Sequence, residues 1–368
     1  MKTQLYIYAV LVAFFAMACN SDEAALKPSN TDEDRVATQI DLNNPTIANL
    51  YATYNSGVLY QYDNILDFAY VASTSGEAAR WEGIEIPELK TLFTDTLGIM
   101  AAEDVPAYNA YVEQAVTFID TTLFKYFKPN TRIAGLMPYK VLLSESVFSD
   151  SEVTGESGSV LVESESRYSS KATSALRAVY NANSIVFAVN QDEVAKDIDE
   201  YTKDNFYILL CRIMGMHDLY NEVPDSFFEG KSTYYGQNME APYKAYMNWG
   251  DEKTVYVIDK DWFYSLGFID ATYFYASSGL RTYYQSYDED GNRLPTRITH
   301  LKALRPTYSF VAGKAVDVRS YINEMIHRYE SELLAFPENI QANLVILRDL
   351  LTTWGVDIVS INPALEAL

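Results

Sequence analysis

Histidine, the most common zinc ligand, occurs at only three positions of the 368-residue chain: His217, His300 and His327. Two histidines four residues apart on a helix lie on one face and can bind Zn²⁺ together. His217 has Ile213 four residues before it and Asn221 four residues after it. The sequence therefore lacks the histidine pair that helical zinc sites use.

Two other segments have residue types that could bind a metal ion. Glu324 and His327 lie one helical turn apart, as in carboxylate-bridged metal sites, but such sites need a second pair that this sequence lacks. We therefore expect His327 at an exposed helix position. Residues Asp288–Asn292 resemble the start of a calcium loop, yet the twelfth position is Thr299 in place of a glutamate. This segment is better interpreted as a polar hairpin turn.

The remaining catalytic patterns are weak. The sequence has no Gly-x-Ser-x-Gly nucleophile elbow, phosphate-binding loop or Gly-rich dinucleotide fingerprint. Cys211 lies in the most apolar stretch, where burial raises the pKa of a thiol, so we expect an unreactive core cysteine. Paired carboxylates of the glycosidase type are not diagnostic among 50 acidic residues.

The composition narrows the choice of partner. A formal net charge of −22 disfavours binding to nucleic acid or to an anionic surface, because both require basic patches. Thirty tyrosines and four tryptophans could supply stacking surfaces for sugars or peptides. Tyrosine more often occupies strands and half-buried surfaces, so no single tyrosine is assigned to a ligand.

The first residues have the features of an exported lipoprotein. Lys2 precedes the apolar run Leu5–Ala18, which is short for a membrane span and typical of a cleaved signal peptide. The tripeptide Ala-Met-Ala directly before Cys19 resembles the lipobox at which bacterial lipoproteins are acylated. We expect residues 1–18 to be removed and Cys19 to carry the lipid. Cys211 is the one other cysteine, so no intramolecular disulfide can form after acylation.

The residues after Cys19 predict the location of the protein. Asn20-Ser21-Asp22-Glu23 resembles the acidic tetrapeptides that direct lipoproteins of Bacteroidota to the outer face of the outer membrane. Residues 19–44 are polar and lack hydrophobic periodicity, which predicts a flexible linker. The expectation is a cell-surface protein held to the membrane by its lipid anchor.

Hydrophobic periodicity and capping residues predict a single α+β domain over residues 45–368. Gly355 is expected to end the last long helix. A Ser/Glu-rich loop with a hairpin is expected at residues 149–170. Helices are expected at 45–54, 106–124, 203–220, 317–335 and 337–353, and strands at 58–62, 137–143 and 184–189.

A series of short segments is informative through its order and spacing: Tyr54-Asn55, Val58–Tyr62, Phe124–Phe127, Pro138–Leu143, Tyr220–Phe227, Arg348–Leu351 and Trp354–Ile358. Together they resemble the zinc-binding metallopeptidase lipoproteins of Bacteroidota, also described as substrate-import-associated zinc metallohydrolases. The similarity covers most of the chain after the linker. It implies a zincin-like domain with a small sheet, a central buried helix and C-terminal helices.

The resemblance also locates the site that such relatives use. Their central helix carries His-Glu-x-x-His, in which two histidines bind Zn²⁺ and the glutamate acts as general base. The matching positions here are Cys211, Arg212 and Gly215. Gly215 has no ligand, and the fixed charge of Arg212 opposes a dication. The third ligand, a glutamate, would fall near residues 317–320, where none occurs, so we expect no metal or other cofactor.

The resemblance therefore implies a non-catalytic binding or accessory component of a nutrient-import system. A TonB-dependent importer and its binding lipoprotein are the implied protein partners, and a peptide or glycan is the implied ligand. One alternative is an active zinc-dependent metallohydrolase with unrecognised ligands. A second is a glycan-binding or structural surface lipoprotein. Arg212, placed among apolar neighbours, is expected to be buried and to need a carboxylate or carbonyl partner.

Acylation of Cys19 can be tested directly. The wild-type protein should partition into detergent, and Cys19→Ala should abolish both acylation and this partitioning, because the thiol is the acceptor of the lipid. Protease added to intact cells should digest the wild-type protein. Complete protection from the protease would contradict the surface location.

Overall fold

The computed structural model describes residues 34–69, 84–149, 160–161, 174–175, 179–181, 184–253, 258–269, 272–275, 279–282, 303–304, 309–311 and 313–368. The chain divides into a short unit, Met1–Thr38, and a large unit, Gln39–Leu368. A five-residue helix, α2 (Arg35–Gln39), lies within the stretch expected to be a linker. The expected signal peptide, Cys19 and the acidic tetrapeptide lie outside the described residues.

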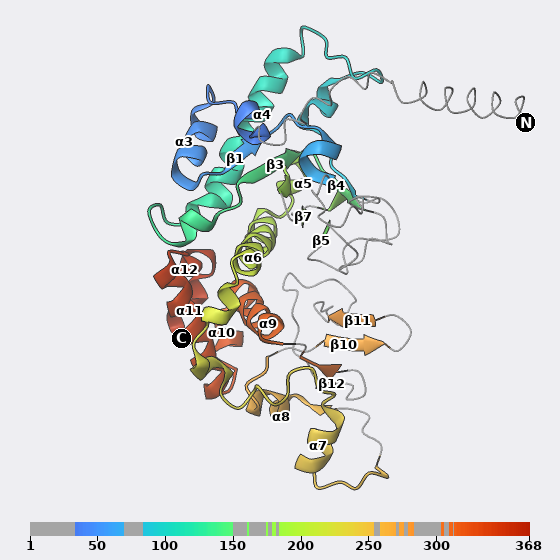
Figure 1. Cartoon of the computed structure of the whole chain (residues 1–368), viewed down its shortest axis with the longest axis vertical. Coiled ribbons are helices and arrows are strands. Elements are labelled where there is room, and N and C mark those ends of the chain that lie inside the picture. Colours follow the sequence, from blue (N-terminus) through green and yellow to red (C-terminus); the bar gives the residue numbers. More distant parts are fainter. Residues whose placement is uncertain are drawn as a thin grey trace, which may run out of the picture. The chain divides into compact units, whose positions relative to one another are not determined.

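The central sheet of the large unit has five strands in the order β1-β3-β8-β7-β5. Strands β1, β3 and β8 are parallel, whereas β7 and β5 are added in antiparallel pairs. Because parallel neighbours need a crossover connection, the chain between β1 and β3 contains the long helix α4 (Figure 1). The bounds are β1 (Gly57–Leu59), β3 (Lys140–Ser144), β5 (Val160–Leu161), β7 (Val179–Asn181), β8 (Ile185–Ala188) and α4 (Val105–Thr122). This mixture of helices and strands is compatible with the α+β class that the sequence predicts.

The parallel strands are apolar on both faces because both faces are covered. Val58, Val141 and Ile185 belong to the main core, together with side chains of the long helices. Their chain neighbours Leu59, Leu142 and Val186 point to the opposite face and form a smaller core. Burial on both sides explains why these strands appear in the sequence as continuous apolar runs.

Capping residues determine where the first helix of the large unit begins and ends. In α3 (Pro45–Tyr54) the Asn44 side chain accepts hydrogen bonds from the backbone N–H groups of Thr46 and Ile47. Asn55 ends this helix in the left-handed conformation, with φ of 54°. The helix expected at residues 45–54 is confirmed, since an N-cap asparagine and a proline at the first position favour helix initiation.

The apolar central helix is α6 (Ile198–Met216), which begins five residues before the position expected from its apolar run. Asp197 explains the earlier start, because its side chain accepts a hydrogen bond from the backbone N–H of Glu200. Most of the helix is buried, and Figure 1 shows α6 beside α9 (Lys314–His327), in agreement with their contacts.

The C-terminal region is helical, but the helix expected at residues 317–335 is divided. It ends at His327, because Arg328 has an extended backbone with ψ of 145°. Gly355, with φ of 100°, ends the last long helix as expected, since glycine adopts this conformation without a Cβ penalty. The helices after α9 are α10 (Glu330–Leu333), α11 (Glu338–Trp354) and α12 (Ile358–Ile361).

Among the described residues no helix has the length and apolar character that crossing a membrane requires.

The other described elements are short. The helices are α5 (Gln191–Val194), α7 (Glu240–Tyr246) and α8 (Lys260–Ser265), with 3-10 or π turns at Asn64–Ala69, Leu89–Phe93, Phe124–Tyr126, Ile133–Leu136, Leu219–Glu222, Asp225–Phe228 and Pro363–Ala367. The strands are β2 (Ile84–Glu85), β4 (Val147–Ser149), β6 (Ser174–Ala175), β9 (Ile258–Asp259), β10 (Thr272–Tyr275), β11 (Gly279–Thr282), β12 (Ala303–Leu304) and β13 (Ser309–Phe310).

Candidate functional site

The three positions that match the zinc motif face different surroundings. Cys211 is 3% exposed and lies in the main core, as expected for an unreactive cysteine. Arg212 is only half-buried, so the deep burial expected for it is wrong. Its guanidinium lies over the ring of Tyr180, 4.9 Å from the centroid, and burial lowers its pKa. Gly215 is exposed near the end of the helix. Cys211 and Gly215 lie one turn apart on the same helix face, but Gly215 has no side chain that could bind a metal ion.

Two contacts show that α6 and α9 run in opposite directions. Asp204, near the start of α6, meets His327 at the end of α9, with 3.2 Å between Oδ1 and Nε2. Phe227, which follows α6 in the chain, packs on Tyr321, nearer the start of α9, with ring centroids 4.9 Å apart.

The resemblance places the third zinc ligand in the stretch 317–320, at the start of α9. The carboxylate found there is Asp317, which is 1% exposed. Its Oδ2 accepts a hydrogen bond from Lys231 Nζ at 3.0 Å and another from the Tyr235 hydroxyl at 2.7 Å. Asp317 is therefore engaged by an ammonium group and a phenol. In the part of the chain that the structure describes, no three His, Cys, Asp or Glu residues gather closely enough to hold a metal ion.

His327 is buried, so its expected exposure is wrong. The side chain is 5% exposed because α9 packs its last turn against α6. Its Nδ1 lies 2.9 Å from the carbonyl oxygen of Asn323, and its Nε2 contacts Asp204. Both ring nitrogens are therefore occupied by protein groups, and the imidazole joins two helices.

Glu324, which the sequence analysis paired with His327, has a different partner. It contacts the guanidinium of Arg328, which also binds Glu332 at 2.9 Å. Burial raises the pKa of Glu324 to about 7, while the charge of Arg328 acts in the opposite direction. The group is a buried ion-pair network that joins the end of α9 to α10, because Arg328 lies between the two helices and binds a glutamate on each.

An aromatic surface lies on α7, α8 and the turn between them, here defined as Tyr243, Tyr246, Trp249 and Trp262. Tyr246 is 64% exposed, and its ring stacks on that of Tyr243 with an angle of 27° between planes. The Trp262 ring lies 5.9 Å from Tyr246 and 5.0 Å from Tyr243, so buried rings support the exposed one. A supported, exposed ring is a suitable stacking surface for a sugar or a planar group.

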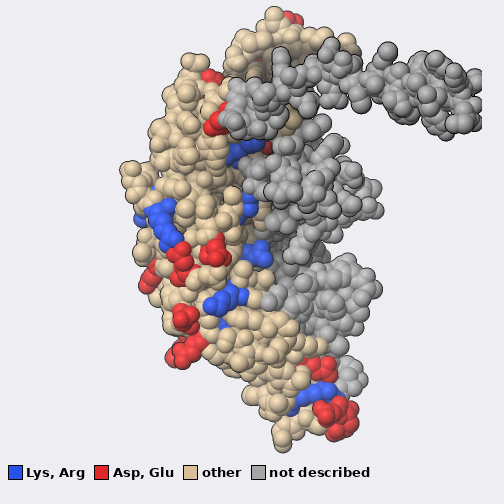
Figure 2. Space-filling model, in the orientation of Figure 1, with Lys and Arg blue, Asp and Glu red and all other residues tan. Residues whose placement is uncertain are grey.

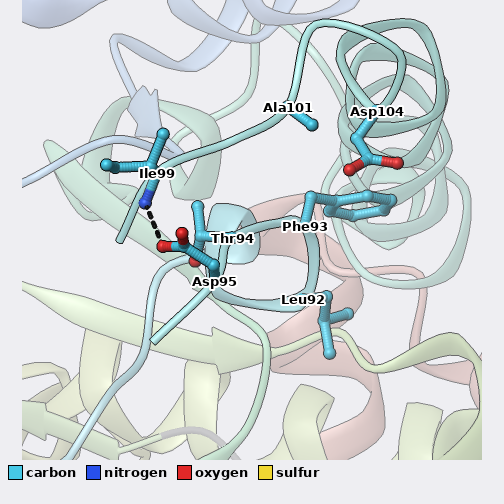
Figure 3. A pocket seen from close by; sticks show the side chains of 7 residues that line it. All are labelled: Leu92, Phe93, Thr94, Asp95, Ile99, Ala101 and Asp104. Atoms are coloured by element: carbon cyan, nitrogen blue, oxygen red, sulfur yellow. Dashed lines mark hydrogen bonds between the residues drawn. The ribbon is translucent and has the colours of Figure 1, made fainter. Parts of the chain in front are cut away.

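A cavity of about 420 Å³ lies beside the start of α4. Figure 3 shows its lining: Leu92, Phe93, Thr94, Asp95, Ile99, Ala101 and Asp104. The carboxylate of Asp95 accepts hydrogen bonds from the backbone N–H groups of Leu97 and Ile99, so it holds the turn at the rim. This lining contains no pairing of a nucleophile with a base.

The charges do not form a basic surface on the face that Figure 2 presents. There, Lys and Arg side chains alternate with Asp and Glu, separated by broad areas of other residues. The described basic residues on this face are therefore interspersed with acidic ones. His300 and the calcium-like segment Asp288–Asn292 lie outside the described residues.

Sequence reasoning missed Asp204, Lys231 and Tyr235 as members of buried polar clusters. Asp204 is 123 positions from His327, and Lys231 is 86 positions from Asp317. No local spacing links such residues. A weak signal was present for Lys231, since it follows Phe227 and Phe228 and precedes Tyr234 and Tyr235, an aromatic setting unusual for a solvated lysine.

Comparison with protein-family models, with curated proteins and with solved structures yields no match to this chain. The resemblance to zinc metallopeptidase lipoproteins therefore stays an expectation from the sequence.

The raised pKa of Glu324 predicts a pH-dependent stability. Below the ordinary value of 4.5 the group is protonated in both states. As the pH rises toward about 7, the unfolded state loses the proton and the folded state keeps it, so the free energy of unfolding falls by roughly 3 kcal/mol. Urea unfolding at several pH values should show this fall, and Glu324→Gln should remove it. The exposed control Glu338→Gln should retain the wild-type dependence; identical pH profiles for all three proteins would contradict the assignment.

Proposed function

We propose that this chain is a metal-free, non-catalytic binding lipoprotein with a metallopeptidase-like domain. The observation that carries the proposal is the engagement of Asp317, the carboxylate in the stretch 317–320, by Lys231 and Tyr235. The three motif positions on α6 carry a cysteine, an arginine and a glycine in place of two histidines and a glutamate. A parallel sheet beside a long buried helix is compatible with the zincin-like arrangement that the resemblance implies.

The electrostatics support the same conclusion. Arg212 keeps a positive charge at all physiological pH values and takes the place of the general base. A cation next to a dication is strongly unfavourable in a partly desolvated site. The residues present therefore do not fit a catalytic zinc ion, and no hydrolytic step is assigned to them.

The cellular role rests on the features at the start of the chain. A lipoprotein of the outer membrane can act beside a TonB-dependent importer as a binding or accessory subunit. The spacer before the large unit would let the domain reach its partner. We propose this role because the relatives that the sequence resembles are associated with substrate import.

The ligand that the described surface fits best is a neutral glycan, as in the alternative of a glycan-binding surface lipoprotein. The exposed ring of Tyr246 is supported from behind by Tyr243 and Trp262. Sugar rings pack their apolar faces on such aromatic surfaces. The chain's high acidity does not oppose a neutral ligand, whereas it would repel an acidic peptide.

Metal analysis tests the central claim. Purified, tag-free protein should contain well under one zinc per chain, and a chelator should leave its thermal midpoint unchanged, because metal binding and folding are coupled in zinc proteins. Arg212→Glu should not restore zinc, since neither Cys211 nor Gly215 becomes a histidine. One zinc per chain that persists after dialysis would select the alternative of an active metallohydrolase.

Affinity electrophoresis in gels containing neutral polysaccharides tests the ligand. A polysaccharide that retards the wild-type protein should retard Tyr246→Ala about tenfold less, because the exposed stacking ring is lost. Tyr329→Ala is the matched control, since Tyr329 is 58% exposed and lies outside the aromatic surface. Equal retardation of both variants, or no retardation of the wild type by any polysaccharide, would contradict the glycan assignment.

A further inference from the structure

The contact between Lys231 and Asp317 has features beyond those of an ordinary ion pair. The two side chains are each 1% exposed, and Nζ lies 3.0 Å from Oδ2. Lys231 follows the short turn Asp225–Phe228, and Asp317 lies in the first turn of α9. An amine and a carboxyl group are therefore held within hydrogen-bond distance of each other in a site closed to solvent.

Aromatic side chains enclose the amine. The Nζ atom of Lys231 lies 3.8 Å from the ring centroid of Phe227, 4.7 Å from that of Tyr321 and 5.6 Å from that of Phe268. The backbone of Gly267 closes the site from another side, since a Cβ added there would lie 3.0 Å from Cε of Lys231. The lysine side chain is therefore fixed, and its amine has little freedom to leave the carboxyl group.

The surroundings favour the neutral forms of both groups. Burial lowers the pKa of Lys231 and raises the pKa of Asp317, while their mutual attraction acts in the opposite direction. A neutral amine is a nucleophile and a neutral carboxylic acid is a better electrophile than a carboxylate. The second carboxyl oxygen, Oδ1, is buried without a hydrogen-bond partner, as expected of a group that is not stabilised as a full anion.

We propose that Lys231 and Asp317 join through a side-chain amide bond formed without any other reactant. The Nζ lone pair attacks Cγ of Asp317, the Cγ–Oδ2 bond breaks, and Oδ2 leaves as water with one proton from the amine and the proton of the acid. Tyr235 donates its hydroxyl proton toward Oδ2 at 2.7 Å, so it stabilises charge on the leaving oxygen. Oδ1 becomes the amide oxygen, which can then accept the hydrogen bond from Tyr235.

The amide bond would connect the two ends of the segment between Lys231 and Asp317 covalently. It joins positions 86 residues apart and closes the chain between them into a ring. Helices α7 and α8 and the aromatic surface lie within that ring. A covalent closure would hold this surface on the domain even when the segment unfolds locally, which suits a protein exposed at the cell surface.

Peptide mapping of the full chain tests the bond. Trypsin cleaves after Arg212, Lys244, Lys314 and Arg319, and it does not cleave after an acylated lysine. The denatured wild-type protein should yield peptide 213–244 joined to peptide 315–319, with a mass equal to their sum minus one water. Fragmentation should place the link between Lys231 and Asp317. Recovery of unlinked 213–231 and 315–319 as the main products would overturn the proposal.

Variants separate the chemistry from simple proximity. In Lys231→Met the methionine keeps an apolar side chain among the rings. Trypsin cannot cleave after methionine, so this variant should yield peptide 213–244 without peptide 315–319 attached. Tyr235→Phe should slow formation of the linked peptide at least several-fold in freshly made protein. Linkage of the wild type at another lysine, or formation of the linked peptide at an unchanged rate in Tyr235→Phe, would overturn the assigned partner or the assigned role of Tyr235.

Discussion

The contact between Asp204 and His327 fixes how α6 lies along α9. Both side chains are almost fully buried, and a buried polar group that loses its partner costs about 1–3 kcal/mol. Sliding one helix by a single residue would separate the two groups, because side chains on a helix turn about 100° per residue. This pair therefore specifies a register that apolar packing alone would leave less well defined.

The same requirement for partners explains why an acidic chain does not create a metal site between these helices. Each buried carboxylate near the α6–α9 contact has a protein partner: Asp204 has His327, Glu324 has Arg328, and Asp317 has Lys231. A buried pair of this kind stabilises little compared with apolar packing, but loss of either member is costly. Removal of Asp317 or of Asp204 would therefore leave its buried partner, Lys231 or His327, without this hydrogen-bond acceptor.

The aromatic residues divide into two populations with different physical roles. Phe227, Phe268 and Tyr321 surround the amine of Lys231, where their rings exclude solvent. Tyr246 instead presents its ring to solvent, supported by buried aromatic neighbours. Both populations are connected through α8 and the residues that follow it, since Phe263 stacks on Phe268. The tight packing around Lys231 thus favours a fixed position for the exposed ring of Tyr246.

The sequence by itself determined the features that depend on neighbours along the chain. The cap at Asn44, the glycine stop at Gly355 and the apolar periodicity of the long helices follow from local backbone and packing requirements. The absence of histidine at positions 211 and 215 is likewise visible in the sequence.

Only the tertiary structure decided which polar side chains are buried and what they meet. His327 was expected to be exposed because one helix does not show what packs against it, and Asp204, its partner, is 123 positions away. The pairing of Lys231 with Asp317 and the position of Arg212 over Tyr180 arise in the same way. Charge and burial at these positions are set by elements distant in the sequence, whose arrangement comes from the packing of the whole core.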